Sequence, residues 1–214
     1  MQRDYWEQYY ATQQSNEQPS DFAQYCTSVF KPDLGCLFDV GCGNARDSIY
    51  FSSNSISVIG IDQSKNAIKK NIAKAAKLGL DTKFFIDDFT CCDYQRLAHE
   101  SFSIYSRFTL HAINHNEEKT FLHLCNGSTD LKYLFIEARS VKDNLYGKGD
   151  NVGPNEFVTT HYRRFIEPNE LRKKLSKYFE ILYFEEGYGF AKNNLEDPCI
   201  IRVIAKKVID VNHM

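Results

Sequence analysis

The sequence predicts an α/β fold: a doubly wound sheet of seven strands that is mostly parallel and closes with an antiparallel hairpin. Short apolar segments alternate with helical ones from residue 36 to residue 138, a pattern typical of a parallel sheet with helices on both faces. Two further apolar segments near the end of the chain have no helix between them, so we expect them to pair antiparallel. A turn with two glycines, Gly41 and Gly43, follows the first apolar segment, as expected where a ligand approaches the backbone.

The composition fits a single domain over residues 1–214. The net charge is -2, so no overall basic field indicates a nucleic-acid partner. The seven cysteines are odd in number and none forms a Cys-x-x-Cys pair, which favours free thiols, no metal site and a cytoplasmic location. No run of about 18 apolar residues occurs, so we expect no membrane insertion.

The first half of the chain is expected to hold three strands and three helices. Phe22, Tyr25 and Cys26 share one face of a helix over 21–30. Asn44 is expected to cap a helix over 44–53, and Ser64 the next helix, which stops at Gly79. The expected strands are 36–41, 57–62 and 82–87.

The second half is expected to contain a helix over 117–126 and another over 167–178, with Pro168 in its first turn. Between the fifth strand and Pro168, residues 139–165 are expected to form a long irregular segment. The expected strands of this half are 101–108, 132–138, 179–188 and 199–207.

The glycine turn and the acid that ends the second strand, Asp62, together indicate a nucleoside site. Ligands of open α/β sheets bind outside the carboxyl ends of the strands, where the Asp62 carboxylate can accept both hydroxyls of a ribose. A dinucleotide requires Gly-x-Gly-x-x-Gly, but Arg46 occupies the third glycine position. S-adenosylmethionine carries no phosphate; its carboxylate can lie against Arg46, and Asp39 can face its ammonium group. An NAD(P)-dependent oxidoreductase is the alternative.

Three motifs, LFDVGCGNARDS, VIGIDQS and FFIDDF, resemble those of the class I S-adenosylmethionine-dependent methyltransferases over roughly residues 35–208. The resemblance implies a Rossmann-like fold and S-adenosylmethionine as cofactor. It also implies a set of cofactor-binding residues: Asp39, Gly41 and Gly43 at the methionine part, Asp62 at the ribose, and Asp88 (favoured over Asp87) with Phe89 at the adenine. Cys42, Arg46 and Gln63, in the same motifs, complete this set. A non-catalytic protein that retains the cofactor fold is a second alternative.

The methyl acceptor is expected beyond the ends of the fourth and fifth strands. His111 could act there as a general base, with His115 as the second choice. The segment after the fifth strand is basic and aromatic, and arginine forks suit phosphate or carboxylate, although a solvated charged loop is the alternative interpretation. The expected catalytic residues are His111, Arg107, Tyr146 and His161, and the expected substrate-binding residues are Arg139, Tyr162 and Arg163.

The motifs YSRFTLHAI, DNLYGKG and HYRRFI resemble a narrower group of bacterial methyltransferases linked to surface polysaccharide and its phosphate-bearing decorations. The chain is also similar to small tellurite-resistance-type methyltransferases. These resemblances imply O-methylation of a small anionic acceptor. No Asn/Asp-Pro-Pro-Tyr/Phe motif marks an amine target in protein or nucleic acid.

Residues 1–30 are expected to form an N-terminal helical lid element. Tyr5, Trp6 and Tyr9 share one face if the segment is helical, and Tyr10 follows them. The family resemblance implies that this element closes over the cofactor, with Tyr5 and Tyr9 in contact with it. An aromatic patch docked on the core is the alternative interpretation.

Overall fold

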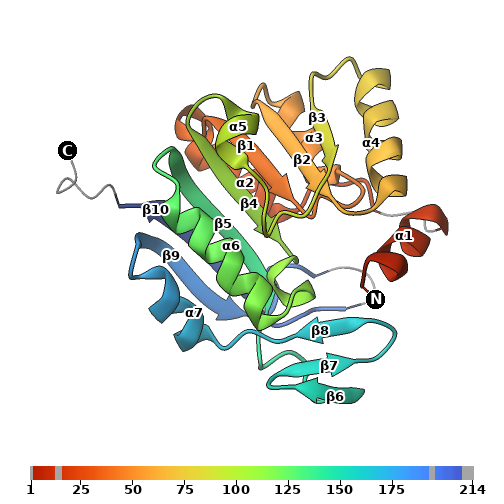
Figure 1. Cartoon of the computed structure of the whole chain (residues 1–214), viewed down its shortest axis with the longest axis vertical. Coiled ribbons are helices and arrows are strands. Elements are labelled where there is room, and N and C mark those ends of the chain that lie inside the picture. Colours follow the sequence, from red (N-terminus) through yellow and green to blue (C-terminus); the bar gives the residue numbers. More distant parts are fainter. Residues whose placement is uncertain (1, 13–15, 193–195, 209–214) are drawn as a thin grey trace.

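The protein, described here by a computed structural model, is built on a seven-stranded sheet with strand order β3-β2-β1-β4-β5-β10-β9 (Figure 1). The structure describes residues 2–12, 16–192 and 196–208. β1 to β5 run parallel, and β10 pairs antiparallel with both β5 and β9. The predicted fold class and its antiparallel ending are confirmed. The strands span Cys36–Val40 (β1), Val58–Asp62 (β2), Lys83–Ile86 (β3), Phe102–Arg107 (β4), Leu131–Arg139 (β5), Phe179–Gly187 (β9) and Ile200–Lys207 (β10).

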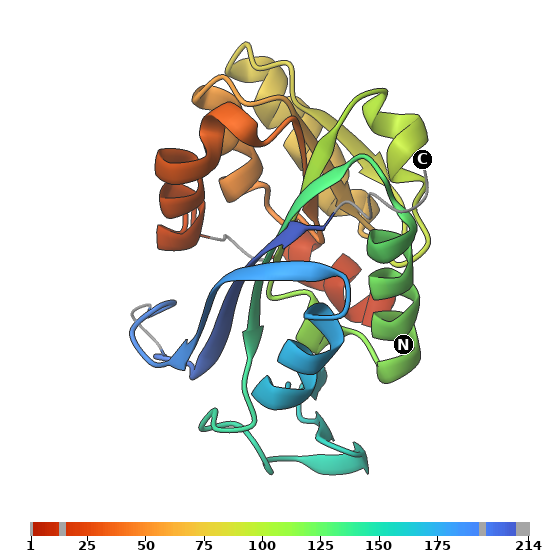
Figure 2. The same cartoon turned by 90° about the vertical axis from the view of Figure 1, so that its left-hand side faces the viewer.

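Helices cover both faces of the sheet. Apolar residues of α2, α3 and α4 pack on one face, and those of α5, α6 and α7 on the other. In Figure 2 the orange α3 and the green α6 lie on opposite sides of the strands. The helices span Asp21–Phe30 (α2), Arg46–Ser53 (α3), Lys65–Lys77 (α4), Tyr94–Ala98 (α5), His115–Gly127 (α6) and Pro168–Leu175 (α7), with short 3-10 turns at Lys31–Asp33 (η1) and Leu110–Ala112 (η2).

The central strands are apolar along their length because helices bury both of their faces. All five residues of β1 are buried. On one face Phe38 meets the ring edges of Tyr94 and Phe102, at centroid distances of 4.9 and 5.3 Å. On the other face Phe51 meets Tyr105 at 5.1 Å. This packing fixes the carboxyl ends of β1 and β4, which border the site described below.

The strand order reverses between β1 and β4, the position where open α/β sheets bind ligands. Helix α1 (Gln2–Thr12) lies at this edge, beside the first turn of α4 (Figure 1). The Ser64 hydroxyl and the Asn66 backbone N–H both donate to Glu7 Oε2, at 2.6 and 3.3 Å. These contacts attach α1 to the start of α4.

Residues 139–165 are not one irregular segment, so that prediction is wrong. They contain a second, antiparallel sheet with strand order β6-β7-β8: Asp150–Gly153 (β6), Glu156–Val158 (β7) and Tyr162–Arg164 (β8). The rings of Tyr146, Phe157 and Phe165 pack against one another, with centroids 5.2 to 5.9 Å apart. Strands of three or four residues are too short to show a periodic pattern, which is why the sequence did not reveal them.

Helix capping agrees with the sequence at α4 and differs at α3 and α6. Ser64 caps α4, because its hydroxyl accepts from the Ala67 N–H at 3.1 Å. Asn44 does not cap α3: Ala45 precedes that helix with φ 56°, and the Asn44 amide donates to the Asn16 carbonyl at 2.7 Å. α6 begins at His115, two residues before its expected start, because Asn114 forms a capping box there.

Of the two helices that the structure describes in residues 1–30, α2 packs into the core, and a lid role for α1 stays a prediction. In α2, Phe22, Ala23 and Cys26 are buried in the core, so this helix belongs to the body of the domain. No helix within the described ranges is both long enough and apolar enough to cross a bilayer.

Candidate active site

A cavity of about 410 Å³ opens at the carboxyl edge of the sheet, beside the reversal between β1 and β4. Its walls come from α1, from the turn after β1, from the ends of β2 and β4, and from the start of α6. Small-molecule sites typically enclose about 300–1,000 Å³. The size and position both suit a nucleoside-sized ligand.

The glycine turn forms the floor of this cavity and requires glycine at both positions. Gly41 and Gly43 have φ values of 64° and 51°, which L side chains rarely adopt. A Cβ atom at Gly41 would lie 2.3 Å from Cγ2 of Thr109, and one at Gly43 would lie 2.3 Å from the Tyr10 hydroxyl. Neighbouring side chains therefore use the space that the glycines leave. Burial, followed by the negative charge of Asp62, raises the pKa of Tyr10.

Asp62 links the ends of the first two strands. Its Oδ2 accepts from the Gly43 N–H at 2.9 Å, and its Oδ1 accepts from the Ser64 N–H at 2.8 Å. Burial raises the pKa of Asp62, and these two backbone N–H groups act in the opposite direction. A carboxylate accepts about four hydrogen bonds, so Asp62 retains capacity for the hydroxyls of a ligand.

Asp39 is the most perturbed acid of the site. It is buried, and its Oδ2 accepts from the Ser48 hydroxyl at 2.5 Å. Burial, followed by the nearby charge of Asp47, raises the pKa of Asp39 to about 7. A bound cation would lower this pKa again, so the position is suited to an ammonium group.

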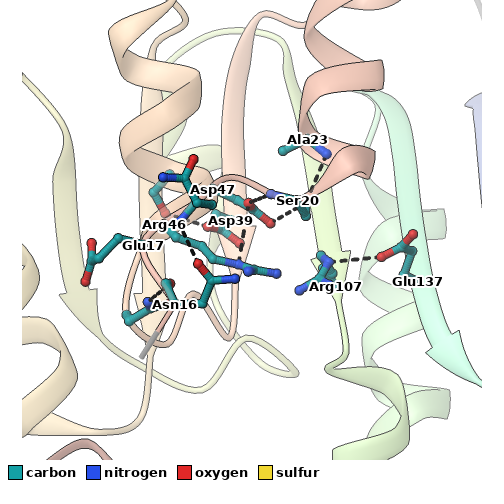
Figure 3. Close-up of polar contacts among 12 residues, drawn as sticks. Asn16, Glu17, Ser20, Ala23, Asp39, Arg46, Asp47, Arg107 and Glu137 are labelled. Carbon is teal, nitrogen blue, oxygen red and sulfur yellow. Dashed lines mark hydrogen bonds and ion pairs between the residues drawn. The ribbon is translucent and has the colours of Figure 1, made fainter. Parts of the chain in front are cut away.

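Asp47, in the first turn of α3, connects the cavity to the N-terminal segment. Its Oδ1 accepts from the Ser20 backbone N–H at 2.7 Å, and its Oδ2 accepts from the hydroxyls of Ser20 and Tyr105 at 2.8 and 3.0 Å. Figure 3 shows Asp47 between Ser20 and Arg46. The only carboxylate contact recorded for Arg46 within the described chain is a long one to Asp47, at 3.9 Å, so this guanidinium is poorly neutralised.

Arg107, at the end of β4, is held by a buried acid in β5. Glu137 is fully buried, and its Oε2 accepts from Arg107 Nε at 3.0 Å (Figure 3). Its Oε1 accepts from Arg202 Nε at 2.7 Å. Two arginines thus share one carboxylate, and the group carries a net positive charge beside the cavity.

Phe108 follows Arg107 with a strained backbone. Its φ is 61°, which is a genuine outlier for a bulky side chain. Its ring lines the cavity and lies 4.4 Å from the Arg107 guanidinium, 5.9 Å from that of Arg139 and 5.3 Å from the ring of His111. Residues held in such conformations concentrate at ligand sites.

Beyond Phe108 lies a group of basic side chains, here called the basic cluster: His111, Arg139, His161 and Arg163. Arg139 is paired with Asp143 and Glu196, at 3.0 and 2.6 Å. Arg163 donates to the Thr159 hydroxyl at 2.8 Å and has no carboxylate within 4 Å in the described ranges.

The basic cluster meets α1 through His161. The His161 ring stacks on Tyr5 at 4.6 Å and lies 5.2 Å from the ring of Trp6, which also lines the cavity. Burial, followed by the charges of Arg163 and Arg139, lowers the pKa of His161 to about 4. The cluster therefore adjoins the cavity at Trp6 and at Phe108.

The structure brings together most of the expected cofactor-binding residues. The lining of the cavity includes Tyr9, Asp39, Gly41, Cys42, Gly43, Arg46, Asp62, Gln63 and Phe89. Two expected residues lie outside this lining. Tyr5 packs on His161, and Asp88 Oδ1 accepts from the N–H and hydroxyl of Thr90 at 2.9 and 2.7 Å.

The expected acceptor residues are more dispersed. Arg107 lines the cavity, whereas Tyr146 is exposed and donates to Asn155 Oδ1 at 2.9 Å. Tyr162 and Arg163 are consecutive in β8, so their side chains point to opposite faces of the small sheet. The Tyr162 hydroxyl is buried and has no hydrogen-bond partner among the residues that the structure describes. A single small acceptor cannot contact both side chains.

Several residues of the site were not predicted. Asp47, Thr109 and Glu117 line the cavity, but an acid or threonine in these positions is ordinary in helices and loops and gives no signal. Phe108 could have been suspected as a large aromatic residue directly after an expected strand. Tyr10 was expected only as part of the lid, and its contact with Gly43 depends on tertiary packing.

The cavity fits a nucleoside with an amino-acid tail. Asp39, Arg46 and Asp62 all line it: the Asp62 carboxylate can accept from vicinal hydroxyls, Asp39 can pair with an ammonium group and Arg46 with a carboxylate. The glycine turn has no side chain at either of its glycines, and Thr109 and Tyr10 pack against it there. No cluster of His, Cys, Asp and Glu suited to a metal ion occurs in the described part of the chain.

Comparison with known proteins agrees with this geometry. The family model described as "Methyltransferase domain" matches residues 35–161. No curated protein matches the chain. A solved S-adenosylmethionine-dependent methyltransferase from Methanosarcina mazei superimposes with a TM-score of 0.69 at 19% identity, covering 83% of this chain and 94% of that one.

Two further solved structures cover nearly the whole chain. TehB from Haemophilus influenzae gives a TM-score of 0.65 at 19% identity, over 97% of this chain and 67% of that one. Magnesium protoporphyrin IX methyltransferase from Synechocystis PCC 6803, solved with bound S-adenosylhomocysteine, gives 0.66 at 15% identity, over 96% and 93%. At these identities the structures establish a shared fold, and the family model covers more than half of the chain.

Proposed function

The chain belongs to the class I S-adenosylmethionine-dependent methyltransferases, and on that premise we propose that it methylates an oxygen atom of a small anionic acceptor. S-adenosylmethionine, when bound, supplies a methyl group on a positively charged sulfur that is already a good leaving group. The residues suited to hold it are Asp62 at the ribose, Asp39 and Arg46 at the amino-acid part, and Phe89 near the adenine. The protein then has mainly to align the acceptor and exclude water.

The proposal of an anionic acceptor rests on one observation: the Arg163 guanidinium has no carboxylate in direct contact within the described residues. Each of the buried arginines in this region has a carboxylate: Arg107 and Arg202 share Glu137, and Arg139 pairs with Asp143. Arg163 is partly buried and has none within the described residues. Burial, followed by the charge of Arg139, lowers the pKa of Arg163. Glu196 and Asp143 oppose this effect only from beyond ion-pair distance. A partly buried cation without a direct carboxylate partner is unfavourable, and an anionic ligand would supply that partner.

Two observations support oxygen as the methylated atom. No amine-directing motif follows β4, and the surrounding basic side chains disfavour binding of a positively charged amine. We further infer that the acceptor belongs to surface polysaccharide or phosphate-decoration biosynthesis, as the narrower sequence resemblance implies. The seven cysteines are all free, which fits the cytoplasm, where we place the reaction.

The test uses purified protein with methyl-labelled S-adenosylmethionine and small-molecule fractions of a bacterial extract separated by charge. We expect acceptors of the anionic fraction to become labelled; alkali should release the label as methanol from a carboxylic methyl ester and leave it in place on a methyl phosphate. Transfer confined to neutral or cationic fractions would exclude the proposed acceptor. Retained binding of S-adenosylhomocysteine without turnover in any fraction would favour a non-catalytic cofactor-binding protein.

A further inference from the structure

His111, which the sequence suggested as a general base, lies beside the cavity in the region where the acceptor is expected. It sits in η2, which follows β4 after Phe108 and Thr109; Thr109 and Ala112 on either side of it line the cavity, and His111 itself lies behind that lining. Its ring is 5.3 Å from the ring of Phe108, which also lines the cavity. His111 is buried, at 8% exposure, and belongs to the basic cluster.

The hydrogen bonding of His111 fixes the position of its proton. The backbone N–H of Arg139 donates to Nδ1 at 3.3 Å, so Nδ1 carries no proton of its own. Burial, followed by the charges of Arg139 and Arg163, holds the pKa of His111 well below its usual range, and the ring is neutral at pH 7. A neutral imidazole whose Nδ1 accepts carries its proton on Nε2. Nε2 has no hydrogen-bond partner recorded among the described residues.

We propose that Nε2–H of His111 donates a hydrogen bond to an anionic oxygen of the methyl acceptor, and that the oxygen methylated is one already ionised at neutral pH, as in a carboxylate or a phosphate. This rests on the proposed function and narrows its acceptor class. His111 is then a hydrogen-bond donor and not the general base that the sequence suggested.

The charged groups around His111 leave no base for an alcohol. Its charged neighbours are the arginines Arg139, Arg163 and Arg164, whereas the nearby ring of His161, whose pKa is lowered to about 4, is neutral at pH 7. The acids in contact with these arginines are already paired: Asp143 and Glu196 with Arg139, and Glu118 with Arg164. A group of cations lowers the pKa of a bound acid and holds its oxygen ionised.

Such an acceptor needs no proton transfer. Its ionised oxygen forms a bond to the methyl carbon as the carbon–sulfur bond breaks, and the electron pair of that bond remains on sulfur. The products are a methyl ester and a neutral thioether. An alcohol would have to lose a proton in the same step, which requires a positioned base.

The first experiment measures the tautomer of His111 directly. Long-range ¹H–¹⁵N correlation spectra of the uniformly labelled protein, saturated with S-adenosylhomocysteine, are recorded between pH 8 and pH 5, and His111 is assigned by its loss in His111→Gln. We expect a neutral ring with the proton on Nε2 throughout. A proton on Nδ1, or titration near pH 6.5, would refute the donor role without bearing on cofactor binding.

The second experiment offers four acceptors of similar size: benzoate, phenyl phosphate, benzyl alcohol and benzylamine. Label from S-adenosylmethionine is expected in the benzoate or the phenyl phosphate product, which also separates carboxylate from phosphate acceptors. Label in the alcohol or amine product only, or in none of the four while S-adenosylhomocysteine still binds, counts against the ionised acceptor. The last result leaves the methyltransferase assignment intact.

The third experiment uses the acceptor that became labelled in the second one. Two variants of His111 distinguish a hydrogen-bond donor from a general base at this position. His111→Gln keeps an N–H donor near the position of Nε2 but cannot take up a proton, so turnover should stay within about tenfold of wild type. His111→Phe lacks the donor and should raise the acceptor KM by roughly 10- to 100-fold. Exposed His123→Gln is the matched control. A loss of about 100-fold or more in kcat for His111→Gln would indicate a base instead.

Discussion

The Tyr10 hydroxyl lies directly over Gly43: a Cβ atom at this glycine would stand 2.3 Å from it. Gly43→Ala should therefore displace Tyr10 and strain a backbone with φ 51°. We expect the affinity for S-adenosylhomocysteine, measured by calorimetry, to fall at least about tenfold because Tyr10 is displaced within the cavity, while the backbone strain of roughly 1–2 kcal/mol lowers stability.

Gly79→Ala provides the control for this substitution. Gly79 has a similar φ of 66°, but nothing lies within 4 Å of its Cβ position. It should lose a comparable amount of stability on thermal unfolding while binding the cofactor normally. Equal affinity losses in the two variants would mean that the contact with Tyr10 has no part in binding.

Asp62→Ala should weaken cofactor binding severely. It removes the proposed ribose ligand and also leaves the N–H groups of Gly43 and Ser64 without their acceptor. We expect at least about a 100-fold loss of affinity together with about 1–3 kcal/mol of stability for each N–H that becomes unsatisfied. Asp62→Asn keeps an acceptor for one N–H and should recover part of the stability. Undiminished affinity in both variants would remove Asp62 from the site.

Cofactor binding should depend on pH through Asp39. Its pKa is raised to about 7, so in the ligand-free protein this acid is half protonated near neutrality. A cationic ammonium group prefers the ionised form. Affinity for S-adenosylhomocysteine should therefore rise up to about tenfold per pH unit toward pH 7 and level off above it. Calorimetry between pH 5.5 and 8.5 measures this dependence.

The same acid should affect stability with the opposite sign. A carboxyl group whose pKa is raised by folding binds more protons when folded than when unfolded, so stability falls as pH rises from about 4 to 7. Asp39→Asn should thus stabilise the ligand-free protein at pH 8 more than at pH 5 and flatten the pH dependence of binding. A dependence that persists unchanged in Asp39→Asn would assign it to another group.

Arg163→Met should act on the acceptor and not on the cofactor. The variant removes the partly buried cation that has no carboxylate partner within the described chain and keeps much of the apolar packing of the side chain. For the acceptor that becomes labelled in the test of the proposed function, the KM should rise about 10- to 100-fold, as expected for loss of a charge-assisted hydrogen bond. Arg96→Met, at a side chain that is 76% exposed, is the control. A fall in cofactor affinity in Arg163→Met would contradict the anion-site assignment.

Arg164 should anchor the small sheet to the site. Its guanidinium pairs with Glu118, and the side chains of Arg164 and Glu118 are each about 2% exposed. The guanidinium also donates to the carbonyls of Ile113 and Leu110, at 2.9 and 3.0 Å. Arg164→Met leaves Glu118 with Lys174 only. Loss of one partner of a buried pair costs about 3–5 kcal/mol, and we expect the lower end here.

The double variant Arg164→Met/Glu118→Met tests whether the cost of Arg164→Met comes from the unpaired charge of Glu118. It leaves no buried charge behind, so urea unfolding should show it to be more stable than Arg164→Met alone. Although burial raises the pKa of Glu118, the charges of Arg164 and Lys174 outweigh it and lower the pKa below its usual range. The stability that Glu118 contributes is therefore present above about pH 4.3 and is lost on further acidification, and Glu118→Gln should remove that acid-sensitive part.

The sheet and the turn that borders the cavity could be predicted because their signals are local. The alternation of apolar and helical segments, the turn at Gly41 and Gly43, and the acids Asp39 and Asp62 at strand ends each follow from a few neighbouring residues. Physical constraints of the backbone, such as positive φ at the glycines, reinforce them. These elements appear in the structure where the sequence placed them.

What could not be predicted depends on contacts between distant parts of the chain. Glu137 lies in an apolar strand, and only the positions of Arg107 and Arg202 explain a buried acid there. Asn44 resembles a helix cap but bonds to Asn16. The donor role proposed for His111 follows from the Arg139 backbone N–H, which no sequence pattern places beside it.

Helix α1 touches both halves of the active site at once. Trp6 covers the cavity and also packs against His161 of the basic cluster, while Glu7 holds the same helix to α4. Because one helix contacts both groups of side chains, a displacement of α1 would alter the cavity and the basic cluster together.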